Sequence, residues 1–197
     1  MNALVVYAHP LGDSLAASLR DAACRGLEAA GYDVEVIDLY ASGFDPNLSA
    51  AERAAYMGET YAVPPEVSEH CRKLREAEIL VLVFPQWWFG MPAILKGFVD
   101  RVFVPGVAFE LDRAGGRLIP LLDRLKGFYV VTTTGSPWWV AELVMRNPLR
   151  RQISMGIRRF CSRTARFRML SLYDLDRAPR EKCAAFVARI ERTFSAL

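Results

Sequence analysis

The sequence predicts an α/β fold in which a parallel sheet carries helices on both faces. Segments with the pattern of strands alternate with segments of helical spacing, an alternation typical of parallel sheets with right-handed crossovers. Two strand segments, 78–84 and 127–134, are almost entirely apolar, which indicates strands covered on both faces. The chain of 197 residues shows no repeat and no flexible linker, so we expect residues 1–197 to form a single domain.

Hydrophobic periodicity places each element along the chain. We expect strands at 2–8, 33–39, 78–84, 127–134 and 168–175. We expect helices at 14–30, 66–76, 92–103 and 178–193, a short helix that starts within 45–52, and a partly helical stretch over 137–162. Gly31 is expected to end the first helix, because glycine readily takes the left-handed backbone that follows a helix. Pro92 suits a first helical turn, and His70 is expected to be exposed on a polar helix.

Composition, charge and cysteine spacing exclude several classes of function. The formal net charge of +3 is too small to indicate a nucleic-acid partner, and no basic run is interleaved with aromatic residues. No apolar run has the length of a membrane span, so we expect no membrane insertion. Because the N-terminus lacks an export signal and the cysteines form no CxxC pair, we expect a cytoplasmic protein with free thiols and no metal site. The cysteines are Cys24, Cys71, Cys161 and Cys183.

Three loops are expected to carry the function, because ligands of open parallel sheets bind beyond the carboxyl ends of the strands. These loops are 9–14 after the first strand, 85–91 after the third and 133–139 after the fourth. Each of them has an unusual composition, so each loop is a separate indication that the functional site lies there.

The first loop, within HPLGDSL, fits two kinds of site. Its last four letters spell the signature of a hydrolase family in which Ser14 would be the nucleophile. Such a serine needs a base, usually histidine, and that family carries it near the C-terminus. The histidines of this chain are His9 and His70, so its C-terminal region offers no such base. We therefore interpret the hydrolase signature as a coincidence.

A phosphate cradle is the interpretation that we prefer for this loop. A loop that leaves a strand and opens a helix presents free backbone N–H groups at the positive end of the helix dipole. Gly12 allows the turn, Ser14 offers a hydroxyl, and His9 can donate a ring N–H to a phosphate oxygen. The plain alternative is that Ser14 or Asp13 only caps the helix and that His9 has a structural role.

Aromatic residues follow the third strand, in FPQWWFGMPAILKGFVDRVF at 84–103. Because the strand has ended, the side chains of Trp87, Trp88 and Phe89 are not all expected in the core. They fit a wall for a flat, mostly apolar ring, and a dimer interface or a local core is the alternative. The third loop, TTTGSPWW at 132–139, supplies hydroxyls and a glycine that suit the polar edge of such a ring.

These motifs resemble the flavodoxin-like NAD(P)H:quinone oxidoreductases. The resemblance rests on ALVVYAHPLGDSLAASL, on DLY with FDPNLSAAE, on the 84–103 motif and on VVTTTG, which together span most of residues 1–135. It implies a flavodoxin-like fold with a five-stranded parallel sheet of order 2-1-3-4-5, a bound FAD or FMN, and a homodimer. It leaves FAD and FMN unresolved, and residues 140–197 match weakly.

The resemblance also implies a set of binding residues. His9 and Ser14 match the loop for the flavin phosphate, Leu15 matches a position that contacts the cofactor, and Ala16 stands where some relatives carry a phosphate-binding asparagine. The isoalloxazine ring would be lined by Pro85, Gln86, Trp87, Trp88 and Phe89, its pyrimidine edge by Thr133, Thr134, Gly135 and Ser136, and the substrate by Trp88, Trp138 and Trp139. The tyrosine and histidine that assist hydride transfer in well-studied relatives have no counterpart within 137–170, so no catalytic side chain is assigned.

The implied activity is that of a flavin-dependent NAD(P)H oxidoreductase, which passes hydride to quinones or similar flat electrophiles in a ping-pong cycle. The alternatives are an electron-transfer flavoprotein, which the positive net charge disfavours, and a redox-sensing accessory subunit of a membrane transporter. Five arginines lie in RNPLRRQISMGIRRF at 146–160. Of these, Arg150 or Arg151 is a candidate to grip the 2′-phosphate of NADPH, and a solvated helix is the alternative.

Overall fold

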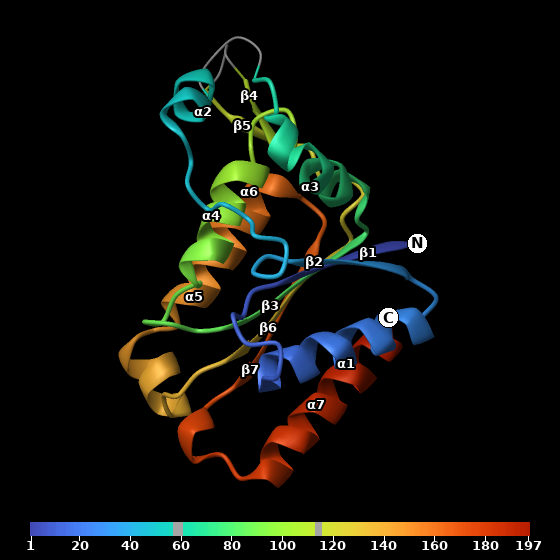
Figure 1. The fold of residues 1–197 in the computed structure, drawn as a ribbon, viewed down its shortest axis with the longest axis vertical. Helices are drawn as coiled ribbons and strands as arrows, with labels where there is room; N and C mark the ends of the chain where they lie inside the picture. Colours follow the sequence, from blue (N-terminus) through green and yellow to red (C-terminus); the bar gives the residue numbers. More distant parts are fainter. Residues whose placement is uncertain (57–60, 113–115) are drawn as a thin grey trace.

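Five parallel strands form the central sheet of the computed structural model, which describes residues 1–56, 61–112 and 116–197 (Figure 1). The strands are β1 (Asn2–Tyr7), β2 (Asp33–Asp38), β3 (Ile79–Pro85), β6 (Gly127–Thr133) and β7 (Arg166–Leu172). Their spatial order is β2-β1-β3-β6-β7, which is 2-1-3-4-5 when these strands are counted along the chain. The predicted fold class is therefore confirmed.

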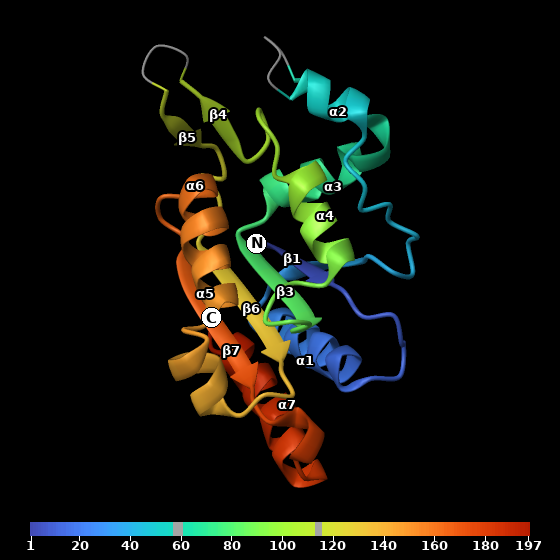
Figure 2. The ribbon, with the colours of Figure 1, turned by 90° about the vertical axis from the view of Figure 1, so that its left-hand side faces the viewer.

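Helices cover both faces of this sheet (Figures 1 and 2). On one face, α1 (Leu15–Ala29) and α7 (Arg180–Ser195) pack side by side. The other face carries α3 (Pro65–Glu76), α4 (Ala93–Val102) and the continuous segment of α5 (Pro148–Arg151), η2 (Gln152–Arg158) and α6 (Arg159–Cys161). The short helix α2 (Ala50–Ala55) is joined to α4 by an ion pair.

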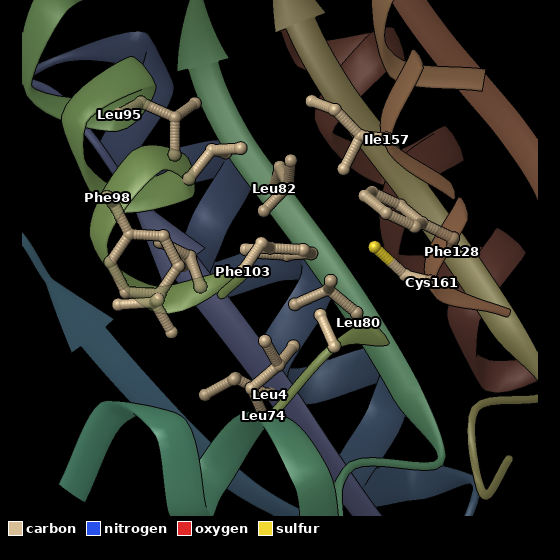
Figure 3. Packing of buried hydrophobic residues seen from close by; sticks show 14 of the residues in the cluster. Leu4, Leu74, Leu80, Leu82, Leu95, Phe98, Phe103, Phe128, Ile157 and Cys161 are labelled. Carbon is tan, nitrogen blue, oxygen red and sulfur yellow. The ribbon is translucent and has the colours of Figure 1, made fainter. Parts of the chain in front are cut away.

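The alternation of side chains along the strands divides the core into two clusters. On β1, Leu4 faces the layer of α3 and α4, whereas Tyr7 faces α1 and α7. In Figure 3, Leu82 of β3 lies between Phe98 of α4 and Phe128 of β6. Because both faces are buried, the central strands are apolar along their length, as the sequence predicts.

The ends of the helices mostly follow the predicted signals. Ser14 caps α1 by accepting a hydrogen bond from the N–H of Ala17 at 3.2 Å, and Gly31 follows the helix with a φ of 84°. Pro92 is the N-cap of α4, with φ −53° and ψ 146°, and so lies just outside the helical turn predicted for it. Proline fixes φ but leaves ψ free, so it ends the extended loop here as readily as it would begin a helix.

Two segments differ from the prediction, and the structure adds detail to a third. The antiparallel hairpin of β4 (Phe109–Leu111) and β5 (Leu118–Pro120) was not predicted, because three-residue strands are too short to show a periodicity. The partly helical stretch at 137–162 consists of the π-helix η1 (Val140–Val144) followed by α5, η2 and α6. Strand β7 begins and ends earlier than the predicted 168–175, because the chain turns at Asp174 into the short helix η3 (Leu175–Arg177).

The prediction that His70 is exposed is wrong. Both of its ring nitrogens are buried, and neither has a hydrogen-bond partner among the described residues. The centroid of its ring lies 5.6 Å from that of Phe44 and 5.9 Å from that of Phe98. Burial, reinforced by the charge of Lys73, lowers the pKa of His70 below its ordinary value, so the ring is neutral at pH 7.

The cysteines are all free thiols. Cys71 and Cys161 are buried, whereas Cys24 and Cys183 are half-buried. Burial raises the pKa of Cys161 to about 12 and that of Cys71 to about 11, so neither forms the reactive thiolate at neutral pH. Within residues 1–56, 61–112 and 116–197, no helix has both the length and the apolar character needed to cross a membrane.

Candidate functional site

The three loops that are predicted to carry the function meet at one edge of the sheet. Tyr7 of β1 pairs with Val83 of β3, and Pro85 of β3 pairs with Thr133 of β6. The second and third loops are also linked, since the N–H of Gln86 donates to the carbonyl of Thr133 at 2.8 Å. Figure 2 shows β3 and β6 side by side with both arrowheads at this edge. The strand order reverses between β1 and β3, and such a switch point is where open parallel sheets bind ligands.

The first loop is fixed by the side chains at its two ends. The ring of Tyr7 is buried, and its hydroxyl lies 3.2 Å from Ser14 Oγ and donates to the carbonyl of Leu11 at 3.4 Å. Ser14 Oγ accepts from the N–H of Ala17, so the structure shows the capping contact that was the plain alternative. A cap of this kind uses one lone pair of the hydroxyl and leaves the first turn of the helix open to an anion.

Several donors in this loop have no partner among the residues that the structure describes. The N–H groups of Leu15 and Ala16, in the first turn of α1, have no hydrogen-bond partner in the described part of the chain. Nδ1 of His9 lies 3.0 Å from the N–H and 3.1 Å from the carbonyl of Leu11. We assign Nδ1 as the acceptor of that N–H, which places the ring proton on Nε2, for which the described residues offer no partner. The side chain of Ala16 is buried, so this residue can offer a ligand only its backbone.

The second loop contains a tight, strained turn. Trp87 and Gly90 exchange two backbone hydrogen bonds, at 3.3 and 3.0 Å. The two residues between them both lie in the left-handed region, Trp88 at φ 53° and Phe89 at φ 58°. Hairpin turns of this kind favour asparagine and glycine. A residue of any other type in the left-handed region costs about 1–3 kcal/mol of conformational free energy. The N–H groups of Trp88 and Phe89 have no partner among the described residues, and 99% of Trp88 is exposed.

The third loop turns its threonine side chains inward. Thr133 and Thr134 are buried, and Thr134 Oγ1 accepts a hydrogen bond from the N–H of Ser136 at 3.3 Å. The neighbouring Thr132 hydroxyl is buried without a partner in the described part of the chain. Residues 135–139, which follow these threonines, are exposed or half-buried and are therefore the part of the loop that a ligand can reach.

Two polar features of this edge were missed by the sequence analysis. Asp176 of η3 lies over Gly135, so closely that a Cβ at position 135 would collide with its carboxylate. Glu142 of η1 accepts hydrogen bonds from the Tyr173 hydroxyl and from the side-chain N–H of Asn147, the latter at 2.6 Å. Burial and the bond to Glu142 raise the pKa of Tyr173 to about 12. No local pattern signals these contacts, because they join residues from separate turns of the chain.

Exposed apolar side chains continue from these loops. Trp138 and Trp139 are 55% and 57% exposed, and Trp87 is 42% exposed. The end of η1 adds the exposed residues Leu143, Val144 and Met145. Apolar surface of this kind marks a ligand site or a protein interface.

The arginines of the basic stretch at 146–160 lie in two different places in the structure. The guanidinium carbon of Arg150 lies 5.8 Å from the ring centroid of Phe167 on β7. Arg158 and Arg159 lie further along, at a hollow beside β5. Recognition of NADPH by Arg150 or Arg151 stays a prediction.

Known proteins resemble this chain in both sequence and structure. The chain is 37% identical over 123 residues to NAD(P)H dehydrogenase (quinone) 1 of Cavia porcellus, which covers 54% of this chain and 44% of that protein. It is 36% identical over 123 residues to ribosyldihydronicotinamide dehydrogenase (quinone) of Homo sapiens, which covers 55% of this chain and 53% of that protein. The chain thus spans about half the length of the curated relatives that it matches.

Similarity of fold extends over the whole chain. The crystal structure of Smu.1420 from Streptococcus mutans UA159 matches with a TM-score of 0.85 at 25% sequence identity, and the match covers 100% of both chains. A family model described as a flavodoxin-like fold matches residues 1–192. The strand order and the switch point at β1 and β3 agree with that match, and the chain therefore belongs to the family of the flavodoxin-like fold.

Proposed function

We propose that this chain is a flavin-dependent NAD(P)H oxidoreductase that transfers two electrons, as hydride, to quinones or similar flat electrophiles. One observation carries the proposal. N–H donors that have no partner within residues 1–56, 61–112 and 116–197 lie together with exposed tryptophans at one edge of the sheet. The names of the relatives that match about half of this chain, both quinone dehydrogenases, support the same chemistry.

The donors at this edge fit a flavin. The first loop would hold the phosphate through His9 Nε2 and the N–H groups of Leu15 and Ala16, at the positive end of the α1 dipole. The strained turn would offer the N–H groups of Trp88 and Phe89 to the polar edge of the ring. The phosphate and the ring are common to FMN and FAD. When bound, the flavin supplies the hydride chemistry, and the protein supplies orientation and electrostatics.

The chain's own groups would bind and orient the reacting partners. Trp88 and Trp138 expose flat apolar faces, against which a nicotinamide or a quinone ring can stack. The N–H groups of Trp88 and Phe89 are fixed by the turn, so they can stabilise negative charge on a ring without reorganising. A single slot for both partners requires the first to leave before the second binds, which predicts ping-pong kinetics.

An absorption spectrum and a steady-state assay test this proposal. We expect the purified protein to be yellow, or to become so with FMN or FAD, and mass analysis of the released cofactor identifies it. Initial rates with NADH or NADPH against a benzoquinone should give parallel double-reciprocal lines. A protein that takes up neither flavin contradicts the proposal. A flavoprotein without quinone turnover would instead indicate an electron carrier or an accessory subunit.

His9→Ala should weaken flavin affinity by about 1–3 kcal/mol, the scale of a hydrogen bond to a charged group. The physical reason is the loss of the Nε2 donor, which has no other partner in the described part of the chain. Quenching of flavin fluorescence measures the affinity. His9→Gln keeps a side-chain N–H and should recover part of the loss. Equal affinities in wild type and His9→Ala would show that His9 serves only to close the turn with Leu11.

We also propose that the protein is a homodimer, because Trp138, Trp139 and the end of η1 expose large apolar side chains close together in the chain, and a two-fold interface would cover them. Sedimentation velocity at micromolar concentration should give the dimer, and Trp138→Glu should shift it toward the monomer. Val36→Glu is the matched control, since Val36 is 41% exposed on the edge strand β2, away from the three loops. A wild-type monomer with flavin bound would contradict the dimer.

A further inference from the structure

A second basic feature lies away from the three loops. A hollow of about 450 Å³ opens between β5 and the end of the segment formed by η2 and α6. Four arginines line it, and we call it the arginine hollow: Arg117, Arg158, Arg159 and Arg163. These residues precede β6 and β7, whereas the three loops follow the carboxyl ends of the strands. Figure 1 shows β5 and α6 toward one end of the molecule and the chain beyond β7 toward the other.

The charges of the arginine hollow are not neutralised by the described protein. No carboxylate lines the hollow, and none of its arginines forms an ion pair within the described residues. Other arginines of the chain are paired: Arg20, Arg25, Arg72 and Arg101 each bond a carboxylate at 2.6 to 2.8 Å. Four cations around one hollow repel one another, and an anion bound between them would remove that repulsion.

Arg158 is held beside the hollow by a hydrogen bond to the backbone. Its Nη1 donates to the carbonyl of Ala165 at 3.4 Å, whereas its Nε is buried without a partner among the described residues. This nitrogen has almost no accessible surface, so an anion in the hollow would contact the terminal nitrogens of Arg158 rather than its Nε. The helix dipole favours cations such as Arg158 and Arg159 near the end of this segment. It does not account for Arg117, which comes from the other side of the hollow.

We propose that the arginine hollow binds the phosphate group of a phosphomonoester or a diphosphate. Planar guanidinium groups donate pairs of parallel hydrogen bonds to phosphate oxygens, and one phosphate offers enough oxygens for several arginines. The group has two possible sources, a soluble phosphate compound and the phosphomonoester headgroup of a lipid. The site is independent of the flavin, because it lies at the opposite edge of the sheet from the first loop.

Calorimetric titration of the purified protein with sodium pyrophosphate tests the proposal. We expect saturable binding that weakens as salt is raised, because the contacts are ionic. The double variant Arg158→Gln/Arg159→Gln should raise the Kd by about tenfold or more, the scale of losing a charge-assisted hydrogen bond. Arg192→Gln is the matched control, since Arg192 is exposed on α7, and it should leave the Kd unchanged. His9→Ala should also leave it unchanged, which separates this site from the first loop.

Vesicles distinguish the two sources of the phosphate. Co-sedimentation with phosphatidylcholine vesicles that contain phosphatidic acid, reversed by pyrophosphate, would assign the hollow to a lipid headgroup. Pyrophosphate binding without vesicle binding would assign it to a soluble compound. If the double variant does not fold, the single variant Arg163→Gln, at an exposed position, takes its place in the titration. The proposal is overturned if neither probe binds, or if binding is lost with His9→Ala but survives the arginine substitutions.

Discussion

Arg101→Ala is expected to lower the free energy of unfolding by about 3–5 kcal/mol, the loss typical of removing one member of a buried ion pair. Arg101 of α4 is 7% exposed, and Glu52 of α2 is 8% exposed. Arg101 Nε donates to Glu52 Oε1 at 2.8 Å, and Nη1 donates to the carbonyl of Asp45 at 2.7 Å. The variant would leave a buried carboxylate without its cation, together with a carbonyl without its donor.

The size of this effect also reflects how many segments meet at Arg101. Its guanidinium carbon lies 5.7 Å from the ring centroid of Phe44, and Glu52 completes a capping box with Ser49 at the start of α2. The ion pair therefore fastens the long connection after β2 to the helix that follows the second loop. Neither of these two segments contains a strand of the central sheet, so no ladder of strand hydrogen bonds holds them in place. Removal of the ion pair should therefore destabilise the fold as a whole.

The loss of unfolding free energy in Arg101→Ala should depend on pH. Burial opposes the ionisation of Glu52, but the hydrogen bonds from Ser49 and the interaction with Arg101 outweigh it, so the pKa of Glu52 lies below its ordinary value of 4.5. A carboxyl group with a lowered pKa in the folded state stabilises the protein above its unfolded pKa, and this stabilisation is lost as the pH falls through the folded pKa. The difference between wild type and Arg101→Ala should thus be largest at neutral pH and shrink below about pH 4.5.

Urea unfolding followed by circular dichroism measures both effects. Lys96→Ala is the matched control on the same helix, because Lys96 pairs with Asp100 at 2.6 Å while both side chains are more than 40% exposed. Exposed pairs contribute about 0–1 kcal/mol, so the control should lose little stability. Equal losses in the two variants would contradict the role assigned to burial.

The sheet and its helices could be predicted because each depends on a local pattern. Leu19 and Leu27 of α1 face one cluster at helical spacing, and the run at 78–84 is apolar because both faces of β3 are covered. The burial of His70 could not be predicted, since it depends on Phe44 and Phe98, which lie far away in sequence.

The position of the site could be predicted more fully than its geometry. The carboxyl ends of parallel strands lie together in any such sheet, so the three loops could be predicted from the positions of the expected strands. The left-handed backbone of Trp88 and Phe89 could not be predicted, because bulky side chains disfavour that conformation. The inward threonines likewise depend on the loop that carries Asp176, which packs over Gly135 from another part of the chain.

Ser14→Asp is expected to weaken flavin binding by about a hundredfold without loss of stability. Aspartate caps helices as well as serine does, and the extended backbone of Ser14, at φ −145° and ψ 159°, accommodates it. Its charge also favours the positive end of the α1 dipole. The same charge would stand beside the flavin phosphate, and like unit charges about 5 Å apart repel by about 3 kcal/mol at an effective dielectric constant of about 20.

Ser14→Asn is the matched control, because asparagine has the same shape as aspartate, caps equally well and carries no charge. We expect it to bind flavin almost as tightly as the wild type, in the same fluorescence titration, and both variants to unfold at similar temperatures without flavin. Equal flavin affinity in the two variants would show that Ser14 only accepts the N–H of Ala17. Weaker binding in the aspartate variant alone separates charge from capping, and it would identify the start of α1 as the phosphate site.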